Sequence, residues 1–127
     1  MRRTPASETP PDTESASALL RHFPADVVAA FDRFRETGEP AAAEIVVFAV
    51  IRDHMVDRAA AANAQFARPQ VLIDDLGFDS MAISEMVFFF EDLFLVTIAN
   101  EEILRVRTVG DLCDFVRAKH AARASAR

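Results

Sequence analysis

The stretch from Ser80 to Leu95 limits the fold most, because it contains no glycine or proline and its apolar residues recur at helical spacing. Steps of three and four residues place four of them on one face of a helix: Ile83, Met86, Phe90 and Phe94. The whole chain has only three glycines among 127 residues, whereas an all-β fold needs many tight turns. The sequence therefore predicts an all-α protein in which this stripe faces inward.

Two more helices are predicted before residue 63. The first lies within residues 18–40, where Pro24 suits a first helical turn and Gly38 suits a helix end. The second should run from about 41 to 62, a region rich in alanine, which is a strong helix former. Each has an apolar face, made of Val27, Val28, Phe31 and Phe34 in the first helix and of Val47, Phe48, Ile51 and Met55 in the second.

Residues 63–79 are predicted to form a long ordered loop, because Pro69 and Gly77 interrupt helical structure there. The three apolar residues at 71–73 are expected to tuck under the core. Serine is a favoured residue at the start of a helix, so Ser80 is a candidate N-cap for the helix that follows the loop.

Two helices are expected in the C-terminal part of the chain. A short one should run from Asn100 to about 106, with Asn100 as its N-cap. The last should begin at 109 or 110, directly after Thr108 as a candidate cap, and continue beyond Lys119 with basic residues near its C-terminal end.

These elements divide the chain into four parts. Residues 1–17 are rich in Ser, Thr, Pro and Glu and are expected to be a disordered leader, and 18–40 form a helical extension. Residues 41–120 form the main domain, and 121–127 form a basic flexible tail. The leader lacks the apolar run of a signal peptide, and no stretch is long enough for a membrane span, so a monomeric cytoplasmic protein is expected.

The charge of the chain is concentrated in one block. Residues 71–116 carry ten acidic and two basic residues, a net charge of −8, whereas the whole chain has −6. Such a block repels the phosphates of nucleic acid and attracts basic protein surfaces. The composition therefore excludes nucleic acid as a partner and favours a basic protein.

The corner "DDLGFDSM", residues 74–81, is the candidate functional site. A serine in this position can simply cap a helix, but here a glycine-containing turn leads directly into the helix and presents Ser80 at a tight corner. The positive end of the helix dipole would suit a phosphate ester on the Ser80 oxygen. The acids nearby disfavour free phosphate, so a nucleotide site is not expected.

Enzymatic and metal-binding alternatives fit the same residues poorly. The nucleophile elbow of serine hydrolases requires G-x-S-x-G after a strand, and neither glycine is present around Ser80. "DDLGFD" lacks the alternating oxygen ligands of a calcium loop. Cys113 is the only cysteine, which excludes an intramolecular disulfide and a multi-cysteine zinc site, and it is expected in the core.

The run "LIDDLGFDSM" resembles the phosphopantetheine attachment motif of acyl carrier proteins. The resemblance covers about residues 41–116 and continues through "SEMVFFFEDLFLVTIANEEILRVRTVGDLCDFV". It implies a four-helix acyl-carrier-like bundle with a long first loop, to which residues 18–40 add an extra N-terminal helical extension. It also implies a carrier that is not an enzyme. Its 4′-phosphopantetheine is attached to Ser80, between Asp79 and Met81, by a phosphopantetheinyl transferase that uses coenzyme A.

The resemblance further implies that acyl groups held as thioesters pass to acyl-transfer and condensing enzymes with basic docking surfaces. The pathway would be fatty-acid, specialised lipid or polyketide synthesis. Ala82, Ala99 and the extension depart from the pattern of fatty-acid carriers and favour a dedicated carrier. Two alternatives stay open: a peptidyl or aminoacyl carrier, and a non-carrier interaction module with the same bundle.

Helical spacing assigns two sets of residues around Ser80. An outer face alternates acidic and apolar residues and is predicted to bind partners: Met81, Glu85, Val87, Phe88, Glu91 and Asp92. An inner set is predicted to line a pocket for the acyl chain: Leu72, Ile83, Met86, Phe90 and Phe94.

Overall fold

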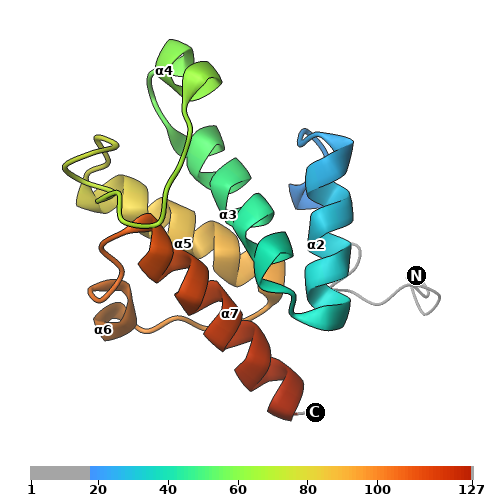
Figure 1. The fold of residues 1–127 in the computed structure, drawn as a ribbon. Coiled ribbons are helices and arrows are strands. Elements are labelled where there is room, and N and C mark those ends of the chain that lie inside the picture. The colour runs from blue at the N-terminus through green and yellow to red at the C-terminus, as the bar shows by residue number, and fades with distance from the viewer. Residues whose placement is uncertain (1–17, 127) are drawn as a thin grey trace, which may run out of the picture.

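The structure is a computed structural model that describes residues 18–126, and its regular elements there are all helices (Figure 1). They are α2 (Ala25–Thr37), α3 (Pro40–His54), α4 (Arg58–Asn63), α5 (Ser80–Phe94), α6 (Asn100–Ile103) and α7 (Val109–Ala126). The predicted all-α bundle is confirmed in this part of the chain. Within the same residues, no helix is both long enough and apolar enough to cross a bilayer.

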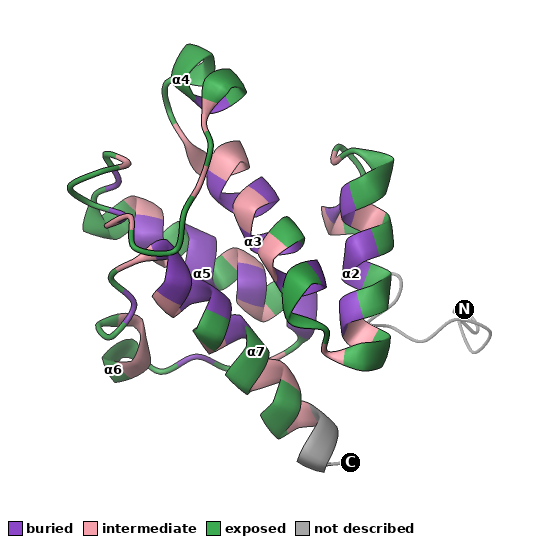
Figure 2. Ribbon diagram, viewed as in Figure 1, coloured by how far each residue is buried: buried purple, intermediate pink, exposed green. Residues whose placement is uncertain are grey.

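Helix α3 lies at the centre of the bundle and packs against α2, α5 and α7. Figure 1 shows α5 crossing the other long helices and α6 lying between α5 and α7 along the chain. The buried faces of the long helices point toward a common interior (Figure 2). The four helices expected from the resemblance are therefore α3, α5, α6 and α7, and α2 is an addition.

Helix α2 packs on the bundle, as a short connection to α3 predicts. Gly38 ends α2 with a left-handed backbone (φ 73°), which lets its N–H donate to the Phe34 carbonyl oxygen at 2.8 Å. Pro40 then starts α3. The rings of Phe31 and Phe34 lie 5.4 and 5.7 Å from the ring of Phe94 in α5. The apolar stripe of the extension is thus core of the same chain.

The single helix predicted from 41 to 62 is wrong, because the chain leaves helical geometry at Met55 (ψ 134°). The Asp57 carboxylate accepts a hydrogen bond from the Ala60 N–H at 3.0 Å and caps the separate helix α4. Arg52 holds the turned segment by donating to the carbonyl oxygens of Ala61 and Ala64, at 3.0 and 2.8 Å. These bonds outweigh the helix propensity of the alanines.

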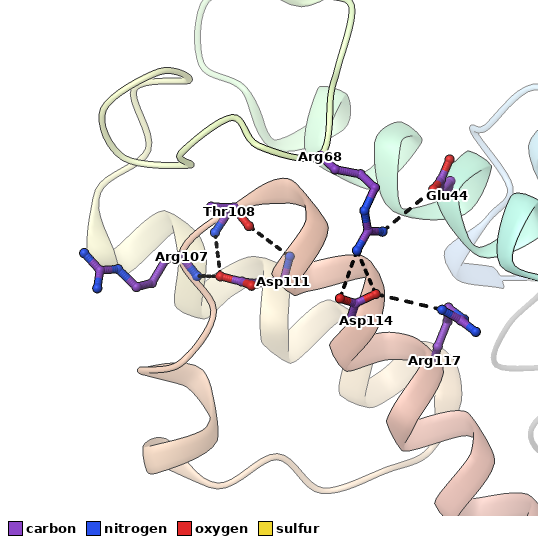
Figure 3. Close-up of polar contacts among 7 residues, drawn as sticks. All are labelled: Glu44, Arg68, Arg107, Thr108, Asp111, Asp114 and Arg117. Atoms are coloured by element: carbon purple, nitrogen blue, oxygen red, sulfur yellow. Dashed lines mark hydrogen bonds and ion pairs between the residues drawn. The ribbon is translucent and has the colours of Figure 1, made fainter.

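The loop from 64 to 79 is fastened to the last helix. Arg68 donates to both carboxylate oxygens of Asp114 at 2.9 Å and lies 3.8 Å from Glu44 of α3 (Figure 3). Hydrogen bonding to Asp114 raises the pKa of the Arg68 guanidinium. A Cβ at Gly110 would lie 3.1 to 3.3 Å from atoms of Arg68, so this close approach favours glycine.

The apolar residues of this loop do not all enter the core as predicted. Leu72 is buried and its N–H donates to the Arg107 carbonyl oxygen at 2.9 Å, beside an isolated bridge between Val71 and Thr108. Ile73, however, is 52% exposed. The loop turns at this point, so its successive side chains face different sides.

Two expectations about the C-terminal helices are also wrong. Ala99, and not Asn100, precedes α6, and its N–H donates to the Glu102 carboxylate at 2.9 Å. This bond and a second one from Lys119 at 2.9 Å lower the pKa of Glu102. Helix α7 continues to Ala126 through an alanine-rich sequence, so the boundary expected after residue 120 falls inside a helix. The predicted leader, 1–17, lies outside the described residues.

Thr108 caps α7 as predicted, because its hydroxyl accepts from the Asp111 N–H at 3.0 Å. Cys113 is a buried core residue, also as predicted. Burial raises the pKa of its thiol to about 11. At neutral pH this cysteine is therefore an unreactive thiol.

Candidate functional site

Ser80 is the first residue of α5 and is exposed, but it is not the cap that the sequence suggested. Asp79 has an extended backbone (φ −97°, ψ 176°), and its carboxylate accepts from the Ala82 N–H at 2.8 Å. Its carbonyl oxygen accepts from the Ile83 N–H at 3.1 Å. Because Asp79 performs the capping, the Ser80 hydroxyl is available at the positive end of the helix dipole.

The turn before Ser80 is held by several hydrogen bonds. The Asp75 carboxylate accepts from the Val71 N–H at 2.7 Å, and the Gly77 N–H donates to the Ile73 carbonyl oxygen at 3.1 Å. Gly77 has a positive φ of 79°, which glycine adopts without strain. Phe78 is buried and anchors the corner in the core. The position of Ser80 is therefore fixed by the turn before it and by the capped helix after it.

An open cleft of about 400 Å³ lies beside Ser80, between the loop, the first turn of α5 and α6. Its polar lining consists of Asp74, Ser80, Ser84 and Arg107. Six apolar side chains form the rest of the lining: Val71, Ile73, Ile83, Ile103, Leu104 and Val106. The cleft thus offers an apolar surface within reach of a group attached to Ser80.

The predicted acyl-pocket residues are only partly brought together with Ser80. Ile83 lines the cleft. Leu72, Met86, Phe90 and Phe94 are buried, which confirms the inward stripe, but they belong to the packed core. The prediction missed Ile73 and the apolar residues of 103–106, although three apolar residues within four positions were a usable signal for the second group.

Four of the six residues predicted for the outer face of α5 are exposed. Met81 is 70% and Phe88 is 54% exposed, and Glu85 and Asp92 are exposed beside them. We call Met81, Glu85, Phe88 and Asp92 the α5 outer face. Exposed apolar groups among acids are typical of a binding surface.

The other two residues assigned to that face have structural roles. Val87 is only 1% exposed, because it follows Ile83 by four residues and shares its buried side. The Glu91 carboxylate accepts from the Ile98 N–H at 2.6 Å and fastens the segment after α5. Val87 is therefore wrongly predicted as a partner-binding residue, and Glu91 already serves the fold.

The histidines do not equip Ser80 for catalysis. His22 pairs with Asp53 at 3.2 Å, and His54 and His120 bond backbone carbonyl oxygens at 2.9 and 3.1 Å. None of the three lines the cleft beside Ser80. Among the residues that the structure describes, no group of three or more His, Cys, Asp or Glu side chains is arranged to hold a metal ion.

Comparisons with known proteins point to the same region. The family model for the phosphopantetheine attachment site matches residues 50–116. The acyl carrier protein of Clostridium acetobutylicum is 30% identical over 73 residues, which cover 58% of this chain and 95% of that protein. No solved structure matches the chain. The matched segment contains the exposed serine corner, the cleft and the α5 outer face.

Proposed function

The chain belongs to the acyl carrier protein family, and from this premise we propose that Ser80 bears its prosthetic group and that the loaded protein delivers acyl thioesters to partner enzymes. A member of this family is a carrier with covalently attached 4′-phosphopantetheine, and it is not an enzyme. The terminal thiol of that group holds the acyl group as a thioester. The observation that carries the proposal is the exposed Ser80 hydroxyl at the start of α5, left available because Asp79 caps the helix.

The surroundings of Ser80 fit a phosphodiester on its oxygen. The first N–H groups of a helix have no partner within the helix, and the helix dipole favours negative charge there. The Asp79 carboxylate occupies only the Ala82 N–H and Met81 is exposed, so the approach to Ser80 is open. Residues 41–120 would form the carrier domain.

Mass spectrometry after loading tests the attachment site. The wild-type apo protein, incubated with coenzyme A and a broad-specificity phosphopantetheinyl transferase, should gain one phosphopantetheinyl group. Ser80→Ala should abolish the gain completely, because no other hydroxyl stands at this corner. Ser84→Ala is the matched control, since Ser84 lies on the same helix and lines the same cleft, and it should load like wild type. Equal loading of Ser80→Ala would refute the assignment.

An acyl cargo fits the cleft better than an aminoacyl cargo. Apolar side chains dominate its lining, whereas an aminoacyl group would bring a charged amine to it. We propose a fatty-acyl or polyketide-type acyl group, with Ile83 and Leu104 among the side chains that contact it. The intact mass of protein isolated from its own host would identify the cargo. An unmodified Ser80 in that sample would instead favour a non-carrier interaction module.

The α5 outer face is the proposed docking surface for the transferase and for acyl-transfer or condensing enzymes with basic surfaces. Changing Glu85 and Asp92 together to lysine should slow loading of Ser80 about tenfold at low salt, because exposed charges act mainly through the association rate. The defect should shrink at high salt, where the charges are screened. Loading rates measured by mass at two ionic strengths check this.

A matched charge reversal separates docking from net charge. Asp32 and Glu36 are exposed on α2, and changing both to lysine alters the net charge by the same amount. This control should load at the wild-type rate, and helicity should be unchanged in both variants. If the two double variants slow loading equally, the α5 outer face is not the docking surface.

A further inference from the structure

We infer that Arg107 holds the phosphodiester of the prosthetic group beside Ser80, an inference that rests on the attachment proposed above. Arg107 and Ser80 line the same cleft, although they are separated by most of α5 and all of α6. Residues 71–116, with their net charge of −8, contain only two cations, Arg105 and Arg107. One of these two therefore lies where an anion is to be attached.

The backbone of Arg107 is fixed while its side chain is left available. Its N–H donates to the Asp111 carboxylate at 3.1 Å, and its carbonyl oxygen accepts from the Leu72 N–H at 2.9 Å. Figure 3 shows the side chain extending away from Asp111 and from the start of α7. Within the part of the chain that the structure describes, its guanidinium forms no ion pair.

Arg68 shows the contrast. Its guanidinium is engaged by Asp114 and Glu44 and holds the fold together (Figure 3). The Arg107 side chain makes no such contact, so only its backbone helps to fasten the loop. A guanidinium offers two parallel N–H donors that match two oxygens of a phosphate group, and it stays charged at any physiological pH.

The local charge favours such a cation. The residues around Ser80 include the carboxylates of Asp74 and Asp79, and Asp74 lines the cleft itself. Without Arg107, a phosphodiester on Ser80 would face these carboxylates with only the helix N-terminus to offset them. Arg107 thus acts as a positioning residue for the group attached to Ser80, because both line the same cleft.

Phosphorus NMR of the loaded protein tests this inference with a readout independent of acyl transfer. Arg107→Gln should move the ³¹P resonance toward that of a freely exposed phosphodiester, and it should abolish any rise in melting temperature on loading. Arg105→Gln is the matched control: it removes the same charge from an exposed residue two positions away that does not line the cleft, and it should leave both readouts as in wild type.

The remaining outcomes also decide the question. An unchanged ³¹P resonance in Arg107→Gln, or equal shifts in both variants, would overturn the inference. If Arg107→Gln is not loaded, the wild-type protein provides a second test. The chemical shift of the Arg107 Nε–H should change between the apo and loaded forms, whereas that of Arg105 should not. An unchanged Arg107 resonance would overturn the inference. Loading at Ser80 is read separately by mass, so failure here leaves the attachment site untouched.

Discussion

Replacing Phe94 with alanine is expected to lower the free energy of unfolding by about 3–5 kcal/mol, the usual cost of removing a buried phenylalanine ring. Phe94 is only 6% exposed and lies where two parts of the fold meet. Its ring is 5.4 Å from that of Phe31 and 5.7 Å from that of Phe34, both in α2, and 6.1 Å from that of Phe90 in α5. The change would leave a cavity bounded by three rings that cannot all move in to fill it.

Phe88→Ala is the matched control for this prediction. Phe88 lies on the same helix and loses the same atoms, but it is 54% exposed, so the cost should be well below that of Phe94→Ala. Denaturant unfolding followed by circular dichroism measures both. Equal losses in the two variants would show that Phe94 is not the junction of α2 and α5.

Helix α5 and the serine corner could be predicted because both depend on local sequence. The apolar steps of three and four identify the buried side of α5, and Ile83, Met86, Phe90 and Phe94 are all buried as predicted. The same pattern fails at the edge of the stripe. Val87 is buried as well, because it follows Ile83 by four residues, whereas the prediction took only one residue from each turn and so made the buried side too narrow.

The break after α3 could not be predicted because it results from a competition. The alanine-rich sequence favours one continuous helix, and the alternative depends on the Asp57 cap and on Arg52 reaching carbonyl oxygens nine and twelve residues ahead. The prediction that Ser80 caps α5 was wrong for a similar reason. Asp79 and Ser80 are both good caps, and only the backbone geometry shows that Asp79 takes the role.

The cleft could not be predicted from the sequence for a different reason. It joins the loop near Ile73 to the segment around Leu104 and Arg107, which are about thirty residues apart in the chain. What brings them together is the pairing of Leu72 with Arg107 and of Gln70 with Val109. Such long-range contacts follow from the packed fold, and the local patterns that predict helices carry no information about them.

Helix α2 leads to the second large effect. A chain that begins at Pro40 should be less stable than one that begins at Ala18, which keeps every residue that the structure describes. The longer chain buries Val27, Phe31 and Phe34, and each buried side chain of this kind stabilises by about 1.5–3 kcal/mol. Ordering α2 costs conformational entropy, which offsets part of this gain, so only the remainder is lost on truncation. For a domain of this size, each kcal/mol of net loss lowers the melting temperature by roughly 4–8 °C.

The shorter chain should nevertheless accept the prosthetic group at Ser80, because no residue of α2 lines the cleft or contributes to the corner before α5. The double change of Phe31 and Phe34 to alanine in the longer chain should reproduce the loss of stability, whereas alanine at the exposed Asp32 should not. Thermal unfolding, intact mass and the oligomeric state are measured on each variant. If instead the chain from Pro40 has the same melting temperature as the longer chain and remains monomeric, the apolar stripe of α2 contributes nothing to the stability of the core. A docking helix for a partner would then explain the stripe better.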